Sequence, residues 1–283
     1  MILETKGLNF HYTFKPERNC LSSMLTNLEE CSGKTMEEIA RVTGIPTGAS
    51  SGKVAPTISY LEYMGLISVN LENKRYDLRY TELGKCVLDE DPGLIEELTL
   101  ELLHCYIVRK QRGAELWSFI VCDLLPKYHG SINKNNFDKE IELRFGKEVK
   151  IAPFNGSYTG LLEQIGFLQI SNTGYCIQPH TIRDDYIFLY GLILYEYWDS
   201  WALSYTDEEK DRNRISLTEI TSEQLEATDY RQPFGWTLQE EYKVLEMLHD
   251  REIISLNRQM SPFSVRKICT REEIIELLYS ELC

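Results

Sequence analysis

The 283-residue sequence lacks several features that would place it at once in a class of proteins. It contains no run of eighteen or more apolar residues, so no typical transmembrane helix is expected. Its first residues show no basic stretch followed by an apolar core, so we expect no secretory signal. None of the eight cysteines forms a CxxC pair, and scattered thiols are typical of reduced cysteines. We therefore expect a cytoplasmic protein that contacts no membrane.

The sequence also lacks a complete set of metal ligands and an excess of basic residues. Cys176 and His180, like Cys122 and His129, have no further ligands nearby in sequence, so we predict no metal site and no cofactor. The net charge of −14 argues against a protein that coats nucleic acid. Residues 1–80 contain nine basic and nine acidic residues, which leaves all of the excess acid after residue 80. That acidic remainder could dock partner proteins or a second copy of the chain, or simply keep the protein dispersed.

Residues 35 to 85 show the pattern of a winged helix-turn-helix. Thr35 followed by Glu38 is a capping box that predicts a helix start, and Gly44 predicts its end. A second helix is expected from Val54 to Tyr63 or Met64. An alternating pair of strands should follow, with a turn within residues 70–75 as the wing. Such a module mostly places a helix in a DNA groove and a hairpin on phosphate, although the fold alone does not prove the function.

The candidate DNA contacts lie in three places of this module. The segment GIPTGASSGK is not a nucleotide-binding phosphate loop, because Gly48 lies too close to Gly52 and Val54 replaces the metal-binding hydroxyl. Its exposed amides and hydroxyls could still bind a DNA phosphate, although a loop chosen only for its glycines would look the same. The predicted contacts are Thr47, Ser50, Ser51 and Lys53 in the loop, Thr57 and Tyr60 on the second helix, and Lys74, Arg75 and Arg79 in the wing.

An internal echo predicts further modules of the same kind. LEYMGLISV at 61–69 resembles LEQIGFLQI at 162–170, and VLEMLHDREIISL at 244–256 is a weaker third copy. We therefore predict a mainly α fold with minor β structure, in which winged helix-turn-helix modules surround a helical scaffold. The expected division is an extension plus winged helix over 1–90, the scaffold over 91–130, a second winged-helix-like module plus a long aromatic helix over 131–205, and a third over 206–283.

Several local expectations accompany this division. Residues 8–14 alternate as a short strand, and Asp91-Pro92 is typical of a helix start. Residues 129–136 and 206–214 are polar and are expected to be connections without regular structure.

Two pairs of carboxylates are candidates for a metal-dependent nuclease. Glu140 and Glu142 would share a face only in a strand, and the adjacent Asp184 and Asp185 would diverge on a helix. No established nuclease motif surrounds either pair. Mg²⁺ or Mn²⁺ would be required only if the protein is a nickase.

Three segments in order resemble a bacterial family, domain of unknown function 4007. They are FHYTFKPERN, GIPTGASSGKVAP with YLEYMGLI, and LTLELLHCYIVRK with AELWSFI, which together cover roughly the first 125 residues. Two departures are that Phe10 and His11 are adjacent and that Glu101 replaces a tryptophan. The resemblance singles out His11, Thr13, Phe14 and Arg18 for testing. An alternative is that these residues only pack the extension onto the scaffold.

The resemblance implies a biological context rather than a catalytic site. Family members accompany cysteine desulfurases and sulfurtransferases, which are hallmarks of DNA phosphorothioation and phage-defence clusters. In the single-strand, Ssp-type version of these systems the corresponding component is associated with DNA nicking. We therefore expect a component that binds double-stranded DNA, with other proteins of the system or a second copy as possible partners. The alternatives are a nickase of the same system, a transcriptional regulator of the cluster, and a scaffold that binds only protein.

Overall fold

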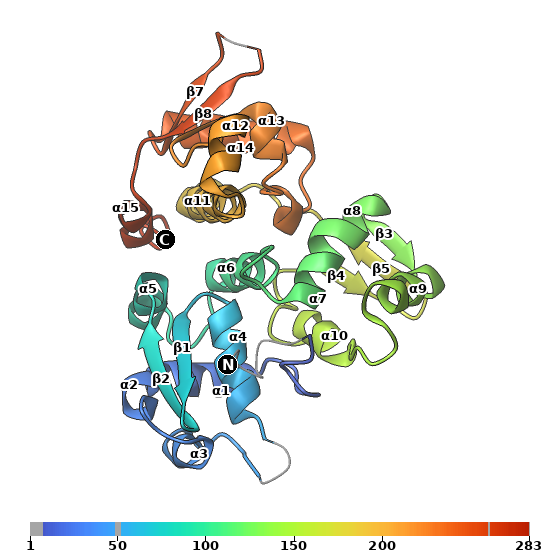
Figure 1. The fold of residues 1–283 in the computed structure, drawn as a ribbon, viewed down its shortest axis with the longest axis vertical. Coiled ribbons are helices and arrows are strands. Elements are labelled where there is room, and N and C mark those ends of the chain that lie inside the picture. The colour runs from blue at the N-terminus through green and yellow to red at the C-terminus, as the bar shows by residue number, and fades with distance from the viewer. Residues whose placement is uncertain (1–7, 49–51, 260, 283) are drawn as a thin grey trace.

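A computed structural model of the chain describes residues 8–48, 52–259 and 261–282. The protein is mostly helical and contains three small antiparallel sheets. Figure 1 shows three groups of elements arranged around the central helix α6 (Glu97–Ile107). Every residue from Leu98 to Ile107 is buried, because all three groups pack against this helix.

The amino-terminal unit contains the two predicted helices and the predicted hairpin. Its elements are α1 (Arg18–Thr26), α2 (Leu28–Cys31), α3 (Met36–Thr43), α4 (Val54–Tyr63), β1 (Ile67–Glu72), β2 (Arg75–Tyr80) and α5 (Glu82–Glu90). The capping box of Thr35 and Glu38 is present, and Gly44 ends α3 in the left-handed conformation, as predicted. The hairpin turn lies at Asn73 and Lys74, whose φ angles are both positive.

The middle unit begins with a helix that changes its winding. Its elements are α7 (Glu115–Ser118), the π-helix η1 (Phe119–Leu124), α8 (Leu125–Lys127), β3 (Ser131–Asn133), α9 (Lys134–Phe145), α10 (Ala152–Tyr158), β4 (Leu168–Ile170) and β5 (Gly174–Ile177). Segment 129–136 was expected to be a linker, which is wrong, because it supplies β3 and the start of α9.

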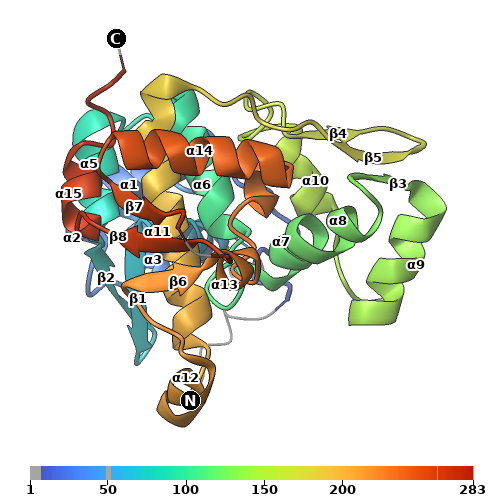
Figure 2. The same ribbon diagram turned by 90° about the horizontal axis from the view of Figure 1, so that it is seen from above.

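The carboxyl-terminal unit is built on the long aromatic helix α11 (Ile187–Leu203), which is buried along most of its length, as predicted. Its other elements are η2 (Asp184–Tyr186), α12 (Asp207–Asn213), β6 (Glu219–Thr221), α13 (Ser222–Glu226), η3 (Gln232–Phe234), α14 (Leu238–Asp250), β7 (Ile254–Asn257), β8 (Ser264–Lys267) and α15 (Arg271–Glu276). Viewed from above, α14 crosses over α11 (Figure 2). Within the described residues, no helix has the length and apolar character needed to cross a membrane.

The three units share one sheet topology. In the second and third sheets, a short strand before the helices pairs with the last strand of the hairpin, in the orders β3-β5-β4 and β6-β8-β7. In the first unit an isolated bridge between Lys34 and Tyr76 takes the place of that short strand. The three sequence echoes therefore correspond to three units of one topology.

Three further local expectations were wrong, each for a local or tertiary reason. Residues 8–14 form turns rather than a strand, because the Phe10 ring packs against Tyr60, Tyr63 and Trp117. Asp91 caps a turn through the amides of Ile95 and Glu96, so α6 starts only at Glu97. The polar segment at 206–214 contains α12, which begins with a capping box at Thr206.

Gly65 provides a test of how the first unit meets α6. This glycine has a φ of +77°, and a Cβ there would lie 2.1 Å from Cδ1 of the Tyr106 ring. Gly65→Ala therefore combines left-handed strain of about 1–2 kcal/mol with overpacking of about 1–3 kcal/mol. Gly44→Ala is the matched control, because Gly44 has a φ of +70° and no atom within 4 Å of a built Cβ. We expect Gly65→Ala to lower the unfolding free energy in urea well beyond the control. Equal losses would contradict close packing on Tyr106.

Candidate nucleic-acid interface

The second helix of the first unit is buried rather than exposed. Every residue of α4 from Val54 to Leu61 is buried, and α1 and the segment before it cover the side that was expected to face DNA. Tyr60 is 1% exposed and donates a hydrogen bond to the carbonyl of Phe14, while the Thr57 hydroxyl donates to the carbonyl of Lys53. The prediction that Thr57 and Tyr60 reach base edges is therefore wrong in this structure.

The loop before α4 is only partly open to a ligand. Ser50 and Ser51 lie outside the described residues. Thr47 is half-buried, and the Lys53 amide donates to the carbonyl of Pro46. The Lys53 ammonium contacts both carboxylate oxygens of Glu17 at 2.8 Å. Hydrogen bonding to Glu17 raises the pKa of Lys53, and the Glu17 carboxylate balances the charge of this ammonium.

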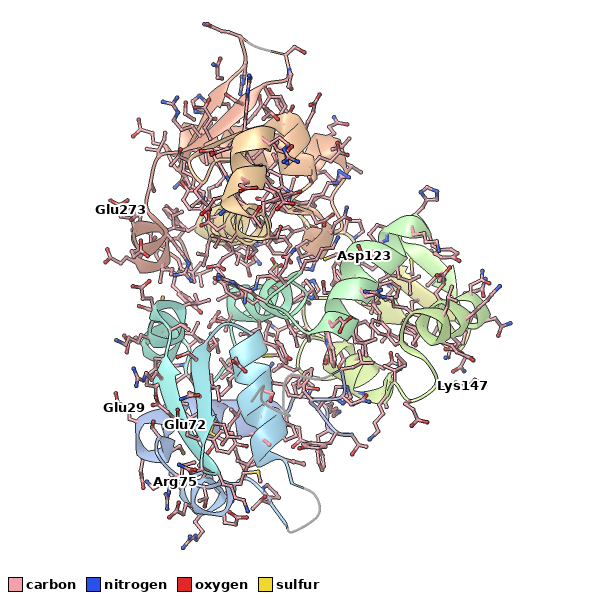
Figure 3. The ribbon with its side chains drawn as sticks, in the orientation of Figure 1. Glu29, Glu72, Arg75, Asp123, Lys147 and Glu273 are labelled. Atoms are coloured by element: carbon pink, nitrogen blue, oxygen red, sulfur yellow. The ribbon has the colours of Figure 1, made fainter. Side chains whose placement is uncertain are left out.

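The hairpin of the first unit carries three exposed basic residues, two of which are paired. Arg75 contacts Glu38 on α3 at 3.0 Å, and Arg79 contacts Asp77 at 2.9 Å. Lys74 is exposed at the turn and forms no ion pair with a described residue. Figure 3 labels Arg75 at the end of the hairpin that lies near α3. Lys74 is thus the wing residue most available to a phosphate.

The four residues singled out by the family resemblance differ in their environments. His11 is fully buried, and burial lowers its pKa to about 4, so it is neutral and packs against Trp117. The Phe14 ring lies 5.9 Å from the Lys53 ammonium. Thr13 is exposed and Arg18 is half-buried at the start of α1. His11 thus has a packing role, as the alternative interpretation expected, whereas the Phe14 ring contacts the Lys53 ammonium.

The four carboxylates proposed for metal binding do not form a cluster. Glu140 and Glu142 lie on helix α9, where residues two apart point in different directions. Glu140 accepts hydrogen bonds from Lys127 and Tyr128, which lower its pKa, and Asp185 pairs with Arg183 at 2.6 Å. In the described part of the chain, no three His, Cys, Asp or Glu side chains are placed to hold a metal ion. These residues therefore do not fit a bound Mg²⁺.

A cleft of about 920 Å³ lies where the three units meet. It is lined by residues that are distant in sequence, among them Tyr63 and Ile67 of the first unit, Phe119, Asp123 and Arg144 of the middle unit, and Glu196 and Arg271 of the third. Asp123 is labelled in Figure 3 on the side of the middle unit toward the carboxyl-terminal unit. No local sequence pattern could predict this cleft, because only the packing of the units brings its residues together.

One buried carboxylate holds the floor of the cleft. Glu196 of α11 contacts Arg109 at 2.7 Å through one oxygen and Arg271 through the other. Although burial alone would raise its pKa, the charges of Arg109 and Arg271 outweigh burial and lower it. Arg109 also stacks on the Tyr106 ring, with its guanidinium carbon 4.0 Å from the ring centroid. The floor is therefore a cluster in which each guanidinium has a carboxylate partner.

The loop between α6 and α7 forms a basic rim. Lys110 contacts Asp123 at 2.8 Å and Asp229 at 2.5 Å. Gln111 has a φ of +63°, and a Cβ at Gly113 would lie 2.4 Å from the carbonyl oxygen of Arg109. Arg112, at the exposed point of this tight loop, forms no ion pair with any described residue. It is the most available cation of the cleft, and the sequence interpretation did not single it out.

The π-helix η1 supplies another part of the cleft lining. Phe119 and Asp123, four residues apart on η1, both line the cleft. π-helical turns are rare and are frequently found at functional sites. The Phe119 ring is half-buried, meets Phe145 edge-on at 5.2 Å, and lies 5.9 Å from the Arg144 guanidinium. This part of the lining thus offers an aromatic ring beside a cation.

Comparisons with known proteins show likeness at the level of the fold. No family model and no curated protein sequence matches the chain, so the resemblance to domain of unknown function 4007 stays a prediction. Two solved structures share the fold: a magnesium-ion-bound crystal structure of SspB, and a second crystal structure of SspB. Each gives a TM-score of 0.63 over 96% of this chain and 86% of the SspB chain, at 14% and 12% sequence identity. The likeness therefore establishes a common architecture along nearly the whole chain.

Removal of the Glu196 charge tests the floor of the cleft. Glu196→Gln leaves Arg109 and Arg271 without their shared partner, and breaking a buried ion pair typically costs about 3–5 kcal/mol. Because the folded pKa of Glu196 is lowered, its contribution is present above its ordinary pKa of 4.5 and is lost as the pH falls through the folded pKa. We expect urea unfolding to show a large loss for Glu196→Gln at pH 7 that shrinks in acid.

Glu241→Gln is the matched control and has the opposite expectation. Burial raises the pKa of Glu241 to about 7, so its native state binds a proton more tightly than the unfolded chain. The contribution of Glu241 to the unfolding free energy therefore falls as the pH rises from 4.5 through 7, by about 3 kcal/mol at most. Because glutamine does not ionise, Glu241→Gln should abolish this decrease. Stabilisation by Glu196→Gln at pH 7 would contradict the proposed role of the floor.

Proposed function

We propose that this chain is a DNA-binding component of a bacterial DNA phosphorothioation system that serves phage defence. The observation that carries the proposal is the likeness of fold to SspB over 96% of the chain. The ordered resemblance of the first 125 residues to domain of unknown function 4007 supports it from the sequence.

We propose further that the three units of common topology are winged helices that differ in the surface they offer. In the first unit α4 is buried, so the contact with duplex DNA is made by the hairpin and not by the second helix. Lys74 at the turn is exposed and unpaired among the described residues, and Arg75 and Arg79 can exchange a carboxylate for a phosphate. In the third unit the surface offered by α14 includes the exposed side chains of Gln239 and Lys243. The first turn of this helix is acidic, so its surface differs from that of the hairpin in the first unit.

Duplex binding and its salt dependence test this proposal. We expect the full chain to bind a labelled duplex at low salt with modest affinity, because few free cations face the DNA. Lys74→Glu should weaken binding to all sequences and reduce the slope of log affinity against log salt by about one. The measurement is fluorescence anisotropy at several salt concentrations.

Arg212→Glu is the matched control for Lys74→Glu. It reverses one exposed charge on α12, away from the hairpin, and should leave the slope unchanged. The absence of any duplex binding at low salt would refute the proposal and leave a scaffold that binds protein. Tight binding to a single promoter site would instead favour a transcriptional regulator.

A nickase of the same system is the second candidate function, because one of the similar SspB structures binds a magnesium ion. The test is conversion of supercoiled plasmid to the nicked form with and without Mg²⁺ or Mn²⁺. Since Glu140 and Asp185 are held in internal pairs, we expect Glu140→Gln and Asp185→Asn to leave any nicking unchanged. Loss of nicking in either variant would show that these carboxylates are catalytic after all.

A further inference from the structure

We infer that the central cleft binds a single-stranded stretch of DNA, with bases stacked on Phe119 and Tyr63 and phosphates on Arg112 and Arg144. This inference rests on the proposed function, because it names the form of DNA that one particular site would take. It concerns a surface that is separate from the hairpin turn with Lys74, although Ile67 and Ser68 at the base of the hairpin line the cleft.

The shape of the cleft favours a single strand over a duplex. Its volume of about 920 Å³ is enclosed by all three units, so its lining faces inward from several directions. Bases in a duplex are stacked within the double helix and cannot reach aromatic side chains in such a recess unless they are extruded. An unpaired strand exposes both its bases and its backbone, so it can enter.

The two aromatic residues are placed to stack against bases. Tyr63 and Phe119 come from different units, both are half-buried, and both line the cleft. Burial raises the pKa of Tyr63 to about 12, so its ring stays neutral at physiological pH. Stacking of bases on aromatic rings beside a positively charged groove is the usual means of binding single strands without sequence preference.

The charge of the cleft predicts that stacking dominates over phosphate contacts. Its lining contains five cations and four carboxylates, and most of the cations are paired. Arg112 is unpaired among the described residues, and Arg144 meets Glu115 only at 3.8 Å. Two available cations imply about two phosphate contacts. For a single strand, the slope of log affinity against log salt concentration is then about −1.4.

The backbone around the cleft supports a built site. Gln111 has a positive φ at the rim, Gly113 tolerates no Cβ, and the π-helix η1 carries Phe119. Uncommon backbone conformations cost free energy and persist where the surrounding structure holds them, which is often at functional sites. Here they place Arg112 and Phe119 on one cleft.

The experiment compares a labelled oligodeoxythymidine of about 12 nucleotides, within the usual site size, with a duplex of the same length. We expect Phe119→Leu to weaken single-strand binding by roughly 5- to 150-fold, the fold-change that corresponds to loss of one stacked base. Phe145→Leu is the matched control, because Phe145 shares the edge-on contact but does not line the cleft. Arg112→Ala should reduce the salt slope by about 0.7, whereas Arg212→Ala should not.

A second measurement uses the wild-type protein, so that it stands even if a variant misfolds. An oligodeoxythymidine carrying 5-iododeoxyuridine is photo-crosslinked, and the modified peptides are identified. Crosslinks located by fragmentation at Phe119 or Tyr63 support the inference, and crosslinks confined to residues 70–79 of the hairpin overturn it.

The failures of the two proposals are distinguishable. Duplex binding that depends on Lys74, with no single-strand binding or with equal effects of Phe119→Leu and Phe145→Leu, overturns the cleft and leaves the proposed function. Single-strand binding that depends on Phe119 without any duplex binding supports the cleft and overturns the hairpin contact. If neither form of DNA binds, both proposals are overturned.

Discussion

The docking of the carboxyl-terminal unit on the rest of the protein depends on the cluster in which Arg109 and Arg271 share the carboxylate of Glu196. Arg109 lies just after the central helix, Glu196 belongs to α11, and Arg271 begins α15, so one cluster joins the end of α6 to two helices of the carboxyl-terminal unit. Arg271 also reaches Glu82 of the amino-terminal unit at 3.3 Å. Three charges taken out of water carry a desolvation cost, which is offset only when each finds a partner. The cluster therefore specifies how the carboxyl-terminal unit docks on α6 and the first unit.

Ion pairing of this kind also explains why the net charge of the chain says little about the charges that its surface offers to a ligand. Arg109, Arg271, Lys110 and Lys53 are all engaged by carboxylates, so they contribute little attraction to a phosphate. Among the described cations of the hairpin and the cleft, only Lys74 and Arg112 form no ion pair with a described residue. A protein with a net charge of −14 can present local positive points, but it cannot hold DNA by charge alone. The shape of the binding surface and stacking on aromatic rings must contribute to the affinity for DNA that we propose.

The sequence predicted those parts of the fold that depend on neighbouring residues. The capping box at Thr35, the helix stop at Gly44 and the turn after Glu72 are local signals, and the structure confirms them. The burial of α4 could not be predicted in the same way. Ile58 and Leu61 identify one apolar face, but Tyr60 on the opposite side is buried by Phe10 and by the carbonyl of Phe14, which come from a segment expected to be a strand. The π-helix and the cleft are likewise products of tertiary packing.

Repetition of one topology has a consequence for where ligands can bind. A winged helix usually presents its second helix and its hairpin to solvent, but in this chain α1 and the segment before it cover the second helix of the first unit. Here α4 is lost to packing, and the concave junction of the units is the surface formed in its place. Gly65 lets the Tyr106 ring lie against the first unit, and the same ring supports Arg109 at the cleft floor. The first unit thus offers no exposed second helix, while the Tyr106 ring that packs on Gly65 supports the floor of the cleft in which we propose that DNA binds.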